Sequence, residues 1–145
     1  MVPKHMRRTR FNGCTLWSSP TLAVLLLAHL SFLEGVRQVC QGSYFFCAVL
    51  DDGRVKCWGW GARGQLGQGS TDNVGLAPGD MGAGLAAVDL GPGEAAQSVA
   101  CGGDHRGGHA CALLASGGLK CWGRGDLLQL GYPSNESVGD GPGEL

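Results

Sequence analysis

The chain has 145 residues, a net charge of −1 and 27 glycines, a glycine content far above the roughly 7% of average usage. This length suits one ordinary domain. The near-neutral charge provides no basic face, so we expect no nucleic-acid partner.

The start of the chain differs in composition from the rest. Residues 1–33 contain no acidic residue, carry four Lys or Arg side chains near the start and end in the apolar run TLAVLLLAHLSFL. This layout is typical of a secretory signal. We therefore expect residues 1–35 to be a hydrophobic N-terminal helix that acts as a cleaved signal or an uncleaved membrane anchor, with an amphipathic or mis-assigned leader as the remaining alternative.

Residues 47–57, CAVLDDGRVKC, have the pattern of two short strands around a turn. A three-residue loop with Gly53 in the left-handed conformation sets Cys47 opposite Cys57. A two-residue loop would set Cys47 opposite Trp58 instead. We prefer the first register because it also explains the cysteines of a second copy of this pattern.

A Gly-x-Gly-x-x-Gly pattern follows at Gly59, Gly61 and Gly64, and Asp80 lies about 20 residues further on, as in a dinucleotide-binding fingerprint. That fingerprint needs a helix that begins at the third glycine and holds the pyrophosphate. The residues after Gly64, QLGQGSTDNVG, do not favour a helix. We interpret the pattern as a turn and expect no cofactor.

The hairpin and its glycine turn occur twice, 64 residues apart. This offset superposes Cys47 on Cys111, Cys57 on Cys121 and Trp58 on Trp122. A fixed period of this kind is the signature of stacked structural units. The two tryptophans are expected to anchor the core, because large aromatic rings dominate burial in small units.

The second copy departs from the first at two places. Leu128 stands where the first copy has Gly64, so a turn expected to need a positive φ loses its permissive residue. Upstream, seven positions separate Cys40 from Cys47, whereas ten separate Cys101 from Cys111. The spacing predicts a three-residue insertion in the second copy.

Seven cysteines are ordinary for a secreted protein and many for a reduced cytosolic one. Loss of the leader would remove Cys14 and leave an even number. We interpret the repeated cysteines as structural staples rather than redox or metal sites, with the pairs Cys47–Cys57 and Cys111–Cys121. Cys40 and Cys101 are then left over, and a bond between them is a hypothesis.

Two further motifs are candidate sites. The stretch CGGDHRGGHAC carries the ligand types of a structural zinc at Cys101, His105, His109 and Cys111. Its spacing is tighter than that of zinc fingers and Cys111 has a competing partner, so we expect no metal and keep a zinc-stabilised domain as a lesser alternative. Asn135 begins the sequon NES, a glycosylation candidate in a eukaryotic secretory route.

Residues 47–67 and 111–131, with the form CALL..G.LKCWG followed by a glycine-rich turn and GQLG, resemble the repeats of the regulator of chromosome condensation family. Residues 75–91 are similar to the long linker of its cysteine-containing, extracellular branch. The resemblance implies an all-β fold: an incomplete β-propeller of roughly two blades built from antiparallel hairpins, with repeats at 36–98 and, truncated, at 99–145. Closed propellers have typically 4–8 blades, so we expect a fragment of a larger propeller or assembly with further blades.

The sequence contains no paired-carboxylate, serine-triad or cysteine–histidine layout, so we predict a protein that is not an enzyme. We expect a module that binds an unknown protein or cell-surface ligand, secreted or on the extracellular face of a membrane, with membrane contact only through an uncleaved anchor. The alternative implied by the founding members of the family is an intracellular regulator: guanine-nucleotide exchange on a small GTPase, or a chromatin or tubulin role. Those members lack an export leader and paired cysteines, so no exchange residue can be carried over.

Overall fold

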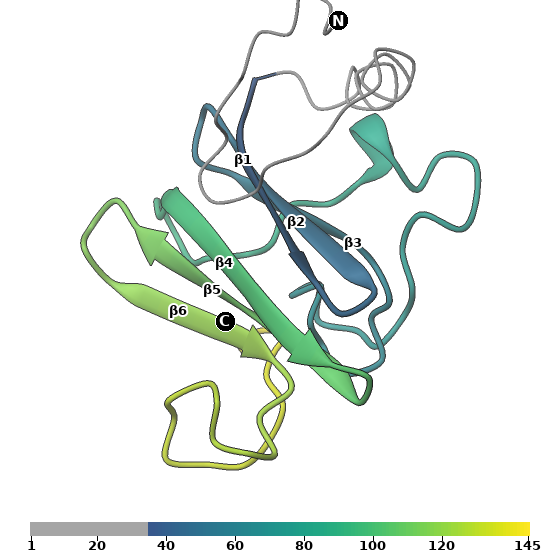
Figure 1. The fold of residues 1–145 in the computed structure, drawn as a ribbon. Coiled ribbons are helices and arrows are strands. Elements are labelled where there is room, and N and C mark those ends of the chain that lie inside the picture. Colours follow the sequence, from purple (N-terminus) through teal and green to yellow (C-terminus); the bar gives the residue numbers. More distant parts are fainter. Residues whose placement is uncertain (1–34) are drawn as a thin grey trace, which may run out of the picture. The chain divides into compact units, whose positions relative to one another are not determined.

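The computed structural model describes residues 35–145, so the leader predicted at residues 1–35 lies outside the described residues except for Gly35. Two three-stranded antiparallel sheets form the structure, each with its strands in sequence order (Figure 1). The first sheet comprises β1 (Val36–Gly42), β2 (Phe45–Leu50) and β3 (Val55–Gly59). The second sheet comprises β4 (Ala96–Asp104), β5 (Gly107–Leu114) and β6 (Leu119–Gly123).

The long segment between the two sheets contains the short 3-10 turn η1 (Gly82–Gly84). Over residues 35–145, no helix is both long and apolar enough to span a membrane. The same segment folds back along β3: the N–H of Val88 donates to the carbonyl of Val55 at 2.8 Å, and the N–H of Val74 donates to that of Gly59 at 3.0 Å. The linker is therefore part of the first structural unit.

The preferred hairpin register is confirmed in both copies. Cys47 lies opposite Cys57, and Cys111 lies opposite Cys121. Gly53 has φ +85° and Gly117 has φ +88°, the left-handed conformation that the three-residue loops require. The alternative pairing of Cys47 with Trp58 does not occur.

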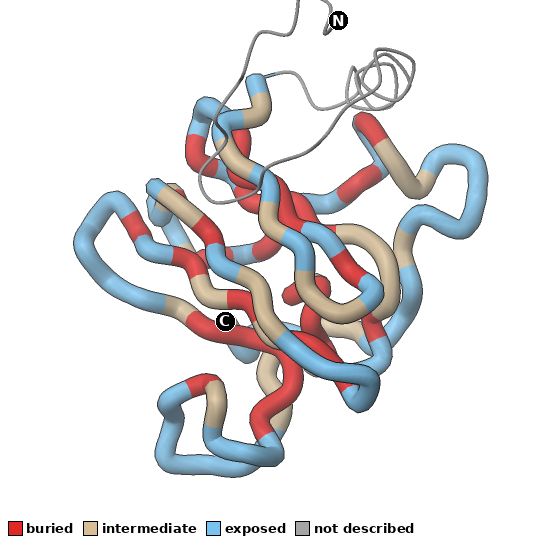
Figure 2. The backbone as a smooth tube through the Cα atoms, viewed as in Figure 1, coloured by how far each residue is buried: buried red, intermediate tan, exposed pale blue. Residues whose placement is uncertain are grey.

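The hydrophobic core lies between the two sheets (Figure 2). In a strand successive side chains point to opposite faces, and the first sheet turns alternate residues of β2 and β3 toward the second. The completely buried side chains from this face are Phe45, Cys47, Val49, Val55 and Cys57. The second sheet meets them with Ala110, Ala112, Leu114 and Trp122. The repeat therefore buries its apolar surface only when two units stack.

The two tryptophans expected to anchor the core differ in their surroundings. Trp122 is completely buried, and its indole N–H donates to the carbonyl of Gln65 in the first repeat at 3.1 Å. Trp58 is only half-buried and stacks on Phe46 with the ring centres 5.8 Å apart. The core prediction is confirmed for Trp122 and is wrong for Trp58, because the face that carries Trp58 points away from the second sheet.

The predicted three-residue insertion is wrong by one residue. Two residues separate Gly42 from its partner Phe45, whereas six separate Gly102 from its partner His109, so the second hairpin is longer by four. The cysteine spacing gave an insertion that is too short, because Cys101 lies one position after the residue that matches Cys40.

That single step in register decides which way Cys101 points. Cys40 lies opposite Cys47 in the first sheet, but Ala100 takes the matching place opposite Cys111 in the second. Cys101 lies opposite Ala110 and so points to the other face, toward the first sheet. The hypothesis of a Cys40–Cys101 bond is confirmed: the disulfide joins the two sheets, with the Cα atoms 5.5 Å apart.

The prediction for the glycine turn is also confirmed. Gly64 has φ +72°, and Leu128 has φ +61° at the matching position. A left-handed conformation costs a residue with a Cβ about 1–2 kcal/mol. The second turn therefore keeps the shape of the first at an energetic cost.

Candidate binding surface at the turn end of the two sheets

The disulfides hold the sheets internally and to each other. Besides the Cys40–Cys101 bond, the structure contains Cys47–Cys57 across β2 and β3 and Cys111–Cys121 across β5 and β6. Each of the latter two spans a sequence separation of 10. These bonds make a rigid frame for the turns at its ends.

The four residues with zinc-ligand chemistry do not converge. Cys101 and Cys111 are both in disulfides, and they point to opposite faces of the second sheet. His105 lies exposed in the β4–β5 turn. His109 shares a face with Cys111, and burial lowers the pKa of its imidazole. Within residues 35–145, no three Cys, His, Asp or Glu side chains are grouped as a metal ion would need.

The Gly-x-Gly-x-x-Gly segment forms a succession of turns, as interpreted from the sequence. The N–H of Gly64 donates to the carbonyl of Gly61, and that of Gly67 to Gly64, each at 2.8 Å. Asp80, the candidate ribose-binding acid, instead accepts the backbone N–H groups of residues 75–77 at 2.9–3.0 Å. The N–H of Ala77, followed by that of Gly75, holds the pKa of Asp80 below its usual range. Asp80 therefore organises the linker loop.

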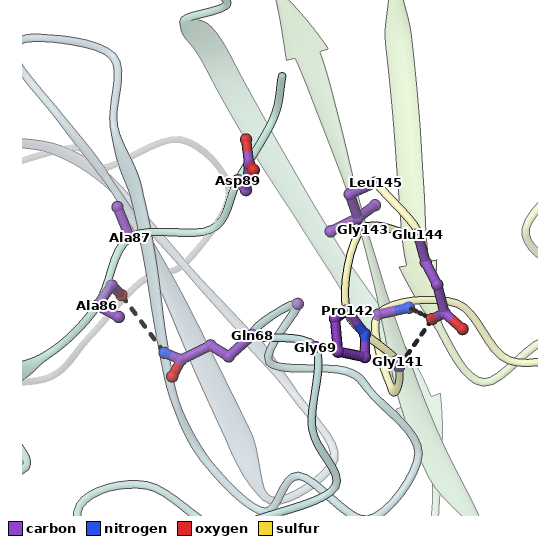
Figure 3. Close-up of a pocket in the computed structure, with 12 residues that line it drawn as sticks. Gln68, Gly69, Ala86, Ala87, Asp89, Gly141, Pro142, Gly143, Glu144 and Leu145 are labelled. Carbon is purple, nitrogen blue, oxygen red and sulfur yellow. Dashed lines mark hydrogen bonds between the residues drawn. The ribbon is translucent and has the colours of Figure 1, made fainter. Parts of the chain in front are cut away.

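A cavity of about 260 Å³ lies between the linker of the first repeat and residues 139–145 (Figure 3). Its polar groups are engaged locally: the Gln68 amide donates to Ala86, and Glu144 accepts the N–H groups of Gly139 and Gly141 at 2.7–2.9 Å. The cavity is therefore the space between two loops, and the polar groups named here already have hydrogen-bond partners within the chain.

The β1–β2 and β4–β5 turns lie at the same end of the two sheets (Figure 1). We call this region the turn end and define it as residues 43–44, 60–65, 104–107 and 124–129. Arg124 lies beneath its surface with its side chain 5% exposed. Its guanidinium pairs with Asp104 at 2.9 Å and with Asp126 at 2.6 Å.

These ion pairs shift the titration of all three groups. The hydrogen bond from Arg124 is the main cause that lowers the pKa of Asp126. For Asp104 the N–H of Arg106 lowers the pKa most, and the charge of Arg124 adds to the effect. The hydrogen bond with Asp126 raises the pKa of Arg124. The extended β4–β5 hairpin is thus tied to the turn that follows β6.

Glycine at position 107 lets arginines from both repeats approach this hairpin. A Cβ there would lie 2.9 Å from Cγ of Arg63 and 3.1 Å from Cδ of Arg124. Arg63 and Arg106 are exposed, and the charge of Arg63 also helps to lower the pKa of Asp126. The first and second repeats therefore share one charged surface.

Aromatic side chains adjoin this charged surface on the first repeat. Tyr44 is 69% exposed and has φ +61°, and its ring meets Trp60 edge to face with the centres 6.0 Å apart. The N–H of Trp60 donates to the carbonyl of Tyr44 at 2.8 Å, which fixes the pair. Tyrosine, tryptophan and arginine are the residues most enriched at protein-binding hot spots.

The Arg124 cluster predicts a specific loss of stability in acid. A carboxylate with a lowered pKa stabilises the folded state above its ordinary value of about 3.9, and this contribution is lost as the pH falls through the lowered pKa. We expect Asp126→Asn to reduce the difference between the urea midpoints at neutral pH and at roughly pH 3. Asp72→Asn, in the exposed loop after β3, is the matched control. An unchanged difference in Asp126→Asn would show that the ion pair is too solvated to contribute.

Comparison with known proteins identifies the repeats. Residues 36–65 and 52–106 match models of the regulator of chromosome condensation (RCC1) repeat. Residues 36–106 therefore contain RCC1 repeats. The chain is 30% identical over 115 residues to the mitochondrial RCC1 domain-containing protein RUG3 of Arabidopsis thaliana, a match covering 78% of this chain and 23% of the relative.

Solved structures support the propeller-blade fold. Human WBSCR16 is 31% identical with a TM-score of 0.53, over 72% of this chain and 24% of that one. Prp20p of Saccharomyces cerevisiae is 17% identical with a TM-score of 0.54, over 72% and 24%, a likeness of fold alone. The chain spans 23–24% of the length of these relatives. The three disulfides agree with the cysteine-containing branch of the family.

The differences between the two copies of the repeat contain the signal for the turn end, which the sequence prediction missed. At the offset of 64 residues, Arg124 replaces Trp60, Asp126 replaces Ala62 and Leu127 replaces Arg63. In the turns that follow β3 and β6, the two copies of the RCC1 repeat therefore carry different side chains at matching positions. Comparing the copies for their differences, rather than their matches, would have pointed to this surface.

Proposed function

We propose that this RCC1 repeat chain is a non-enzymatic, extracytoplasmic module that binds a protein or a cell-surface ligand through its turn end. The observation that carries the proposal is the group of exposed side chains Tyr44, Arg63 and Arg106, beside the half-buried Trp60, on a frame held by disulfides. Aromatic side chains bind with little loss of conformational entropy because they have only two rotatable bonds, and arginine is enriched at binding hot spots. RCC1-like propeller proteins are generally binding or exchange-factor proteins, which agrees with a role in recognition.

Site-specific photocrosslinking tests the binding surface. A photoreactive residue is placed at Tyr44 of the full chain, and a matched control places it at Leu76, which is 80% exposed in the linker. With extracellular extract from the source cells we expect a discrete crosslinked product from position 44 and none from position 76. Equal products from both positions would contradict a binding role for the turn end.

The proposed location depends on the leader and the disulfides, and it is tested by intact mass and free-thiol titration after expression through a secretory route. We expect loss of roughly the first 35 residues and no free thiols. We also expect a glycan on Asn135, which lies in an exposed loop, and none on Asn135→Gln. A retained leader with free thiols would reject the extracytoplasmic location.

The second candidate is an intracellular regulator, favoured by the RCC1 repeats of this chain. Yeast RCC1 (Prp20) has been crystallised bound to Kap60, and Prp20p was described with its binding properties to Gsp1p and histones. Stimulated nucleotide release from a small Ras-like GTPase would favour this role over the first. Completion of the ring by further blades, from this or another chain, is compatible with both candidates.

A further inference from the structure

Three cysteines form one row across the first sheet. Cys40 of β1 lies directly opposite Cys47 of β2, and Cys47 lies directly opposite Cys57 of β3. Cys47 and Cys57 form a disulfide, while Cys40 is bonded to Cys101 of the second sheet. A second disulfide sulfur is therefore the cross-strand neighbour of Cys40.

The row has the geometry of thiol–disulfide exchange. Directly opposed residues share a face, and neighbouring strands lie about 4.8 Å apart, so the three side chains follow one line across the strands. Exchange proceeds by attack of a thiolate on a disulfide sulfur, with the attacking, central and leaving sulfurs in line. A thiolate at Cys40 would approach Cys47 from the side opposite Cys57.

Burial sets the order in which the bonds open. Cys47 and Cys57 are completely buried, whereas Cys40 and Cys101 are partly exposed. A thiol in solution can reach the Cys40–Cys101 bond but has no direct access to the Cys47–Cys57 bond. The buried bond is accessible only from within the row.

The second sheet lacks this arrangement, and its hairpin disulfide also differs in access, because Cys111 is partly exposed whereas Cys47 and Cys57 are completely buried. Ala100 occupies the place opposite Cys111, and Cys111 lies opposite Cys121. The Cys111–Cys121 bond therefore has no third sulfur in line with it. Two repeats of one chain share the staple, and only the first has a neighbouring nucleophile.

We propose that the Cys40–Cys101 bond is a thiol-responsive site and that Cys40, once released, rearranges the buried disulfide. A low-molecular-weight thiolate attacks Cys101, which forms a mixed disulfide and displaces Cys40 as a thiolate. Cys40 then attacks Cys47: the Cys40–Cys47 bond forms, the Cys47–Cys57 bond breaks, and Cys57 leaves as a thiolate that takes a proton. A second thiol removes the adduct from Cys101. One protein disulfide is reduced and the reagent is oxidised to its disulfide.

The rearrangement removes the covalent link between the sheets and forms a new disulfide, Cys40–Cys47, within the first sheet. The sheets then keep the apolar core and non-covalent contacts that include two hydrogen bonds between the Gln38 side chain and the backbone of Val99, at 2.8 and 3.0 Å, and the hydrogen bond from Trp122 to Gln65. The new bond joins β1 to β2, so Cys40 is no longer free to re-form its link to Cys101. The site thus acts as a switch of inter-sheet attachment, a property beyond the binding function proposed above.

The test is partial reduction of the oxidised full chain with glutathione. The reaction is quenched with acid, free thiols are alkylated, and peptides are mapped without reduction, with Cys14 scored separately. We expect a Cys40–Cys47 linked peptide and alkylated Cys57, with roughly tenfold less alkylation of Cys57 in a chain that lacks the Cys40 thiol. Alkylation of Cys40 and Cys101 with the Cys47–Cys57 bond intact would overturn the proposal, as would alkylation of Cys57 without any Cys40–Cys47 linked peptide.

Two variants make the result specific. In Cys40→Ser with Cys101→Ser, the row lacks its nucleophile and the Cys47–Cys57 bond is expected to resist the same glutathione concentration. Ala100→Cys builds the missing row in the second sheet, and it is expected to make the Cys111–Cys121 bond exchange as well. If the double serine variant loses its fold, the presence or absence of the Cys40–Cys47 linked peptide in the wild-type map still decides the question.

Discussion

Gly64→Leu is expected to lower the free energy of unfolding by about 3 kcal/mol or more, the combined cost of a left-handed leucine and an overfilled interface. A Cβ at this position would lie 2.6 Å from the backbone N of Asp140 and 2.9 Å from the carbonyl O of Val138. Both atoms belong to the backbone of the second repeat and cannot rotate away. The substitution therefore forces the two repeats apart.

The second repeat provides the matched control, because Leu128 occupies the same place in a turn with a similar φ, +61° against +72°. Leu128 is 60% exposed, so Leu128→Gly removes strain without changing a repeat interface within residues 35–145. We expect it to raise the free energy of unfolding by about 1 kcal/mol. Urea unfolding of the oxidised chain, followed by tryptophan fluorescence, measures both. Similar effects of opposite sign in the two variants would mean that φ alone, and not the contact between repeats, accounts for Gly64.

Trp122→Ala is expected to cost about 3–5 kcal/mol, the range for removal of a large buried aromatic side chain. The ring is completely buried, its N–H bonds to Gln65, and it lies so close to Gly67 that a Cβ there would come within 2.9 Å of its nitrogen. The variant therefore loses apolar burial, a hydrogen bond and shape fit at the contact between repeats.

Trp58→Ala tests whether position in the repeat or stacking of the repeats causes this effect. Trp58 has the matching place but is half-buried and contacts Phe46 on the open face of the first sheet. We expect a cost of about 1 kcal/mol, the value of one aromatic pair. The same chemical denaturation series compares the two variants, and equal costs would contradict the asymmetric burial.

The residues that set local geometry could be predicted because their effects are short-ranged. Gly53 and Gly117 lie in left-handed turns between the two strands of their hairpins. The length of each turn sets the register, so that Cys47 lies opposite Cys57 and Cys111 lies opposite Cys121. The strained turn at Leu128 followed from the same reasoning, because the backbone shape of a repeat is inherited at each copy. Repeat period, hairpin register and turn strain were therefore all present in the sequence.

The turn end was not predictable in the same way, because its members come from segments that are distant in sequence. Asp104 reaches Arg124 only through the four extra residues of the β4–β5 hairpin, and Arg63 reaches the hairpin only because position 107 is glycine. Cysteine spacing gave a hairpin extension one residue too short. The error concealed the step in register that turns Cys101 toward Cys40.

By itself the sequence determined the repeat, its hairpins, the cysteine pair within each hairpin and the family, since these depend on periodicity and on residues close together in the chain. Only the tertiary structure decided which face of each sheet is buried, why Trp122 and not Trp58 is enclosed, and how Cys40 comes to be bonded to Cys101 while it lies opposite Cys47. The physical reason is that both copies carry nearly the same pattern, whereas burial depends on which face meets a neighbour. Stacking two similar units therefore places their equivalent residues in different environments.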